Sequence, residues 1–214
     1  MVLGANDGIV STAALLLGVA AADSGRDAIL TAGIAGLVAG AISMALGEYV
    51  SVASQRDSER SDIAKETLEL ETQQEHELEE LVGIYQARGL SRGLAEQVAA
   101  ELTAHDALGA HLRDELGIEQ HDLARPVQAA VSSAASFGIG AALPLIAASI
   151  ASRSTRIGVI LVVALFALIA LGIAGAKAGG AKYGRPVVRI VVGGVVAMAF
   201  TIDRKSTRLN SSHT

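Results

Sequence analysis

The chain of 214 residues is 51% hydrophobic and only 18% charged, with a net charge of −5. An acidic balance argues against a nucleic-acid partner, and the absence of cysteine excludes disulfide bonds and thiolate metal ligands. Of the 22 acidic residues, 17 lie between Ser51 and Arg125. This is the charge distribution of a membrane protein with one soluble insert.

Two apolar runs begin the chain. The first, Met1–Ala22, is long enough for a membrane span of about 20 residues. A signal peptide is a poor interpretation, because no basic leader precedes the apolar core and Asp7 lies within it. The polar turn Asp23–Asp27 leads to the second run, roughly Ala28–Ala53, and the two spans are predicted to form a helical hairpin.

The second span is predicted to continue beyond the membrane. Neither glycine nor proline occurs between Gly47 and Gly83, so one helix can run from the apolar segment into the acidic one. We therefore expect a single helix to join a transmembrane path to a carboxylate-rich domain.

Residues 55–125 are predicted to form the soluble insert, built of about three helices. Their apolar residues recur at helical spacing, as in Leu78, Leu81, Val82 and Tyr85. Glycine-containing positions predict the helix breaks, at Gly83, Arg88–Ser91, Gly109 and Gly117. Ser91 is a candidate N-cap of the second helix, and Pro126 closes the insert.

Three further apolar runs, Val127–Ala151, Ile157–Ala176 and Val187–Ile202, are predicted to span the membrane, with a kink at Pro144 in the first. Gly36 and Gly40 are spaced for close helix packing, within a subunit or across a dimer. The predicted fold is an all-α membrane protein. It has five transmembrane helices and a helical insert between spans two and three.

The predicted domains are residues 1–54 (spans one and two), 55–125 (the insert), 126–202 (spans three to five) and 203–214. A cytoplasmic insert and Lys177–Arg189 loop place 11 basic residues inside and three outside, which the positive-inside rule favours. Residues 203–214, DRKSTRLNSSHT, resemble a translated sequencing adapter. We therefore expect a non-native tail after a truncated last span, with a genuine basic tail as the alternative.

Asp7 is the sharpest functional signal, because an ionisable residue in a span usually faces a cavity, a partner or an ion path. The alternative is a first helix that starts near Ala5, with Asp7 as its interfacial N-cap. Met44 and Glu48, four residues apart, share a face of the second span and offer a thioether and a carboxylate to one site. The alternative for Met44 is a packing role, which is the usual role of a methionine in an apolar helix.

The insert carries two carboxylate pairs three residues apart and one imidazole–carboxylate pair four apart: Glu66–Glu69, Glu77–Glu80 and His111–Glu115. Such ligands suit Fe(II), Mn(II) or Zn(II) better than Cu(I), and a solvated acidic face without a ligand is the alternative. The remaining histidines of the insert have no distinguishing spacing: His76, His105 and His121. No nucleotide-binding, hydrolase or paired di-iron motif occurs, so neither an ATP-driven pump nor an enzyme is expected.

Three segments of the chain carry a family resemblance: ANDGIVST at 5–12, AISMALGEYV at 41–50 and ALPL at 142–145. They resemble the vacuolar iron transporter family, also called the VIT1/CCC1 family, and the resemblance covers residues 1–202. It implies a dimer of five-span subunits that exchanges Fe(II), and often Mn(II), for protons and moves metal out of the cytosol.

The resemblance also implies roles for individual residues. Asp7 and Met44 would line the ion path at the dimer interface. The carboxylates of a cytoplasmic metal-binding domain would be Glu66, Glu69, Glu77, Glu80 and Glu115. Compared with the plant form, a membrane glutamate falls at Gly36, with Glu48 one helical face away, and a methionine pair falls at His111–Leu112.

The expected function is therefore proton-coupled export of Fe(II), and of Mn(II), from the cytosol. The alanine-rich composition and bulky insert resemble bacterial members of the family, which implies a bacterial plasma membrane. Expected partners are metal ions, protons, membrane lipid and a second copy of the chain, with no tightly bound cofactor; Fe(II), Mn(II) or Zn(II) is the transported or bound ion. A membrane-anchored metal-binding or sensing protein is the alternative, and a ferritin-like membrane oxidase is a further one.

Overall fold

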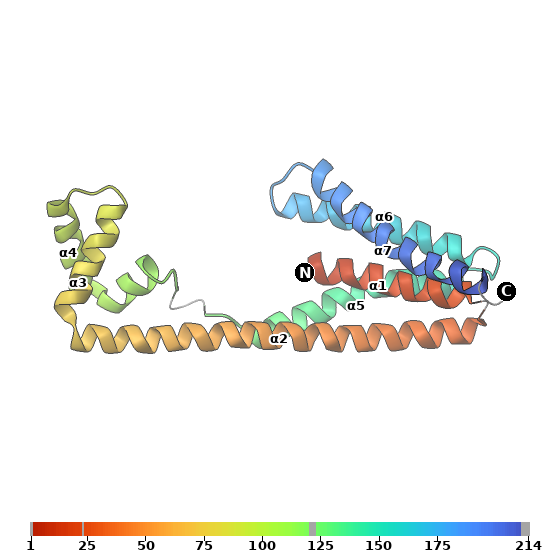
Figure 1. The fold of residues 1–214 in the computed structure, drawn as a ribbon, viewed down its shortest axis with the longest axis horizontal. Helices are drawn as coiled ribbons and strands as arrows, with labels where there is room; N and C mark the ends of the chain where they lie inside the picture. Colours follow the sequence, from red (N-terminus) through yellow and green to blue (C-terminus); the bar gives the residue numbers. More distant parts are fainter. Residues whose placement is uncertain (1, 23, 120–122, 211–214) are drawn as a thin grey trace. The chain divides into compact units, whose positions relative to one another are not determined.

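The computed structural model describes residues 2–22, 24–119 and 123–210, and all regular elements in these ranges are α-helices (Figure 1). This confirms the all-α prediction. In chain order the helices are α1 (Val2–Ala21), α2 (Arg26–Thr72), α3 (Gln74–Ala87), α4 (Arg92–Asp114), α5 (Pro126–Ile150), α6 (Arg156–Ala178) and α7 (Gly184–Asn210).

Within the described ranges, four helices are long and apolar enough to cross a membrane: α1, α2, α5 and α6. They coincide with the first four predicted spans. The predicted fifth span falls in α7, which is not among these four, so the five-span count stays a prediction. The α7 backbone continues through Asn210 into the predicted tail, and residues 211–214 lie outside the described residues.

The chain divides into two compact units, and the first consists of residues 1–48 and 127–214. Helix α1 packs against α6 and α7. Their shared core includes Leu16 and Leu17 of α1, Ile160 and Leu168 of α6, and Met198 of α7. By contrast, many large apolar side chains on the outer faces are more than half exposed, such as Ile42 and Phe166, which is the pattern of surfaces that face lipid.

Glycines allow α1 and α5 to meet backbone to backbone. A Cβ atom at Gly8 would lie 2.2 Å from the carbonyl oxygen of Phe137, and one at Gly140 would lie 2.2 Å from that of Ala5. The predicted close approach at Gly40 is also present, but there an aromatic ring fills the space. A Cβ at Gly40 would lie 2.2 Å from Cζ of Phe137.

The helix boundaries bear on two sequence-based interpretations in the first unit. Helix α1 begins at Val2, so Asp7 lies inside the helix, and the interpretation of Asp7 as an N-cap is wrong. Pro144 lies inside α5, as predicted.

Helix α2 runs unbroken from Arg26 to Thr72, which confirms the predicted continuity between the apolar and the acidic segment. The next break occurs at Gln73, so the break predicted at Gly83 is wrong. Gly83 lies inside α3 with no atom within 4 Å of the position of a Cβ. An exposed glycine costs a helix only about 1 kcal/mol, which the packing of α3 offsets.

The second unit, residues 49–126, contains the end of α2 together with α3 and α4. Leu81, Val82 and Tyr85 of α3 pack against Ala95 and Ala99 of α4. The turn between these helices includes Gly89 at φ +101°, which confirms the predicted break at 88–91. Ser91 occupies the N-cap position, but its side chain forms no capping hydrogen bond.

The end of α4 departs from a regular helix twice. Gly117, at φ +65°, follows the helix where a break was predicted. The break predicted at Gly109 instead occurs at Asp106, whose backbone is extended (φ −160°, ψ 84°). The helical residues after Asp106 carry His111.

Candidate metal centre

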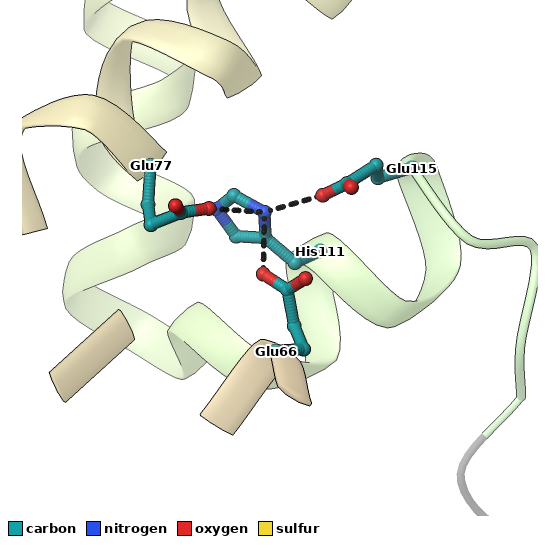
Figure 2. Close-up of side chains that lie close together, drawn as sticks. All are labelled: Glu66, Glu77, His111 and Glu115. Carbon is teal, nitrogen blue, oxygen red and sulfur yellow. Dashed lines mark hydrogen bonds and ion pairs between the residues drawn. The ribbon is translucent and has the colours of Figure 1, made fainter. Parts of the chain in front are cut away.

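Four side chains of the second unit converge on one point (Figure 2). Glu66 comes from α2, Glu77 from α3 and His111 from the last turn of α4, and Glu115 is the C-cap residue that follows α4. Nδ1 of His111 lies 2.9 Å from Oε2 of Glu115, 3.0 Å from Oε1 of Glu66 and 3.9 Å from Oε2 of Glu77. Three carboxylates thus surround one imidazole nitrogen.

The cluster is buried and short of hydrogen-bond donors. Glu66, Glu77 and His111 are 3%, 4% and 0% exposed. Nδ1 of His111 forms a hydrogen bond with Glu115, which leaves Oε1 of Glu66 and Nε2 of His111 buried without a hydrogen-bond partner. Unpaired buried carboxylates are costly, so a bound cation would stabilise this arrangement.

The electrostatics of the cluster also favour a bound cation. Burial raises the pKa of Glu66, and repulsion by Glu115 raises it further, while His111 acts in the opposite direction. The cluster therefore favours a positive charge, either a proton or a metal ion.

The geometry fits a single first-row divalent cation. One ligand atom from each of the four residues can be chosen so that all lie within 4.8 Å of one another. Metal–oxygen and metal–nitrogen bonds of about 2.0 to 2.2 Å place ligand atoms roughly 3 to 4 Å apart. Modest closure of these side chains would therefore complete a site of three oxygen ligands and one nitrogen ligand.

Glu77 also belongs to a second group, formed with His76 and Glu80. Its Oε1 atom lies 3.5 Å from Nδ1 of His76, whose side chain is 72% exposed. No spacing signal marks His76, because its partner is the adjacent residue, Glu77, on the same turn. Glu80 lies in this group rather than in the buried cluster.

Glu69 does not join the buried cluster. Its carboxylate lies 3.1 Å from Nζ of Lys65, one turn earlier on α2. The predicted pair Glu66–Glu69 is therefore split, with Glu66 in the cluster and Glu69 in a surface ion pair.

A cavity of about 490 Å³ adjoins the cluster and is lined by Glu77, Leu78, Thr103, Ala107 and His111, among others. Oγ1 of Thr103 is buried without a hydrogen-bond partner. The cavity has polar and apolar lining residues and is large enough for several water molecules, so solvent can reach the cluster through it.

Asp114, next to Glu115, fastens the end of α4 to α3. Its carboxylate accepts hydrogen bonds from the Tyr85 hydroxyl and from Arg88, each at 2.7 Å. Burial alone would raise the pKa of Asp114, but the hydrogen bonds from Tyr85, Arg88 and Arg113 outweigh burial and lower this pKa to about 2. Burial and the bond to Asp114 raise the pKa of Tyr85 to about 12.

In the first unit, Asp7 of α1 and Met44 of α2 line one cavity of about 220 Å³. Hydroxyl groups of Ser11, Thr12 and Ser43 add polar lining, and Phe137 of α5 is its aromatic wall. The structure therefore brings Asp7 and Met44 together. Glu48, expected to share the site of Met44, does not line this cavity.

The four apolar helices and the second, acidic helical unit are the features of an all-helical membrane protein. A model of the VIT family matches residues 1–202. The chain is 46% identical over 202 residues to "Vacuolar iron transporter" of Acanthamoeba castellanii, which covers 94% of this chain and 74% of that protein. It is 39% identical to "Vacuolar iron transporter homolog 1" of Oryza sativa, and the match covers 94% of this chain and 68% of that protein. It is 37% identical to "Vacuolar iron transporter homolog 2.1" of Arabidopsis thaliana, and that match covers 93% of this chain and 75% of the relative.

The chain belongs to the VIT family. The members of this family are transporters and not enzymes, which confirms the family expected from the three sequence segments and the expected absence of an enzymatic activity.

Proposed function

We propose that this protein exports Fe(II), and also Mn(II), from the cytosol in exchange for protons. The observation that carries the proposal is the cavity of α1 and α2, where a carboxylate and a thioether meet inside two helices apolar enough to span a membrane. A borderline divalent cation is the ion that this pair of ligands suits. The names of the relatives, which are iron transporters, support the same substrate.

The insert, residues 55–125, acts in this proposal as a cytoplasmic collector of metal. Glu66, Glu77, His111 and Glu115 hold the ion, and the burial of the first three supports this assignment over a solvated acidic face. Glu69 and Glu80 lie beside this site and provide weaker oxygen ligands on the way to it. An imidazole in place of a thioether favours Fe(II) or Zn(II) over Cu(I).

Asp7 requires a partner in the membrane, and we assign that role to a second copy of the chain. In the single subunit its side chain is exposed, on a stripe of α1 that also exposes Leu3, Ser11 and Leu15. An exposed charge in a bilayer costs at least about 2.5 kcal/mol, so lipid is an unfavourable neighbour. A homodimer that pairs the two Asp7 residues would cover this face and enclose the ion.

Proton coupling follows from such a pair. Two nearby carboxylates cannot both ionise easily without a cation, so the metal-free pair holds a proton. Metal binding then expels that proton, and the reverse exchange on the other side returns one. Glu48, one turn along α2 from Met44, supplies the next carboxylate on the path.

The insert faces the cytosol of a bacterial cell, and the plasma membrane is the membrane crossed.

The proposal is tested by flux into liposomes. The purified chain is reconstituted, and Fe(II), Mn(II) or Zn(II) is added outside under anaerobic conditions, with empty liposomes as the control. Uptake of Fe(II) and Mn(II) that depends on a proton gradient is the expected result. Metal binding by the chain without uptake would support the second candidate, a membrane-anchored binding or sensing protein. The buried cluster alone could account for such metal binding.

A further inference from the structure

The last part of α4 is a separate helical segment that carries two of the four cluster residues. At Asp106 the backbone is extended, and the helix restarts after it. Residues 107–115, which we call the carrier segment, include His111 and Glu115. Because the break removes the constraint of a continuous helix, the direction of the carrier segment is set by whatever holds its two ends.

At its first end, the carrier segment is held by Asp106. Oδ1 of Asp106 accepts a hydrogen bond from the backbone N–H of Gly109 at 3.0 Å. This is the bond that an aspartate N-cap makes to the third residue of a helix. A Cβ atom on Gly109 would lie only 2.1 Å from Oδ2 of Asp106, so a glycine is required for the carboxylate to occupy this place.

At its other end, the carrier segment is held by Asp114. Tyr85 and Arg88 of α3 bind the Asp114 carboxylate, and Nη2 of Arg88 also donates to the Asp114 carbonyl oxygen at 2.9 Å. Between the two ends, Ala110, His111 and Leu112 are almost fully buried. The segment is therefore fixed against α3 at one end and capped at the other.

The cap determines where the imidazole points. Glu66 and Glu77 lie on helices α2 and α3, so their carboxylates meet His111 only if the carrier segment keeps its present rotation. A shift of the helix start by one residue rotates every following side chain by about 100°. We propose that Asp106 is a positioning residue, which through its bond to Gly109 holds His111 and Glu115 in register with Glu66 and Glu77. This inference rests on the proposed role of the cluster in binding metal.

The test is a Co(II) titration of the full chain in detergent under anaerobic conditions, read by the visible absorption of the bound ion, which reports its ligands. We expect Asp106→Ala to weaken Co(II) binding roughly fivefold to tenfold and to change the spectrum, because a lost N-cap is worth about one power of ten or less. Asp106→Asn, which keeps the cap without the charge, should restore both. Glu101→Ala, an exposed acid before the break on the same helix, is the matched control and should bind as the parent does.

Gly109→Ala separates positioning from simple stability. Alanine raises helix propensity, yet its Cβ would displace the Asp106 carboxylate, so we expect unchanged or higher helix content together with weaker Co(II) binding. Parent-like affinity and spectrum in both Asp106→Ala and Gly109→Ala would overturn the proposal, as would an Asp106→Asn chain as weak as Asp106→Ala. Glu66→Gln tests the cluster itself. If Glu66→Gln binds Co(II) like the parent, the cluster is not the metal site. The proposal for Asp106 would then be overturned because its premise is wrong, and not because of the Asp106 variants.

Discussion

Nδ1 of His111 lies 3.0 Å from Oε1 of Glu66, and neither side chain is more than 4% exposed. An imidazole buried against carboxylates at this distance can serve as the nitrogen ligand of a bound cation. We expect His111→Gln to weaken binding of Fe(II) and Zn(II) by about 10-fold or more, and binding of Mn(II) less, because Mn(II) depends more on oxygen ligands.

The measurement is equilibrium titration of each metal into the detergent-solubilised chain. His105→Gln provides the control, since His105 is exposed on the same helix ahead of the break. Equal losses for Mn(II) and Zn(II) would mean that His111 contributes to folding of the insert and not to metal preference.

The bond between Tyr85 and Asp114 predicts a specific pH dependence of stability. The pKa of Asp114 is lowered from 3.8 to about 2, so its stabilisation is complete above pH 3.8 and is lost as the pH falls toward 2. The pKa of Tyr85 is raised from 10.0 to about 12, so its stabilisation is complete below pH 10 and is lost as the pH rises toward 12. Each shift corresponds to about 2 to 3 kcal/mol, and the two shifts share one hydrogen bond.

Tyr85→Phe isolates this contribution. The difference in free energy of unfolding between the parent and this variant should be constant from pH 5 to 9, at roughly 1 to 2 kcal/mol, and should shrink at both extremes. Denaturant titration followed by circular dichroism gives the difference at each pH. Tyr183→Phe, at an exposed site, should show no such profile. A Tyr85→Phe difference as large at pH 2 as at pH 7 would contradict the assignment.

The crossing of α1 and α5 predicts that the same substitution has different effects at two glycines. Gly8→Ala places a methyl group 2.2 Å from the carbonyl oxygen of Phe137, and backbone cannot move aside cheaply, so we expect destabilisation of about 1 to 3 kcal/mol. Gly138→Ala, with no atom within 4 Å of its Cβ position, should be neutral or slightly stabilising. Thermal unfolding in detergent compares the two. Similar melting temperatures for both variants would show that the helices do not cross this closely.

The long helix and most of the spans could be predicted because they depend on local properties. Continuous apolar composition and the lack of glycine or proline after Gly47 are enough to specify a helix through Thr72. The turn at Gln73 could not be predicted, because no residue type there opposes a helix. The packing of α3 onto α4 decides it, and that packing is a tertiary property.

The residue types of the site could be predicted from the sequence, but their arrangement in space could not. Spacing along one helix pairs Glu66 with Glu69, whereas the structure pairs Glu66 with His111 from another helix. Similarly, Asp7 and Met44 were expected on one path from family resemblance, and their common cavity depends on how α1 lies against α2. The sequence predicts the break at Gly109, whereas it occurs at Asp106. The glycine is needed where the Asp106 carboxylate packs as an N-cap, and it is not itself the break.

The central claim is that metal crosses the membrane past Asp7 in exchange for protons. The most direct measurement follows Fe(II) uptake and internal pH together in proteoliposomes that contain a pH-sensitive dye, for the parent and for Asp7→Asn. Asparagine keeps the size and an oxygen ligand but cannot release a proton. We predict Fe(II) entry with simultaneous proton exit in the parent, and loss of both in the variant. An Asp7→Asn chain that moves Fe(II) against a proton gradient at the parent's rate would contradict the account.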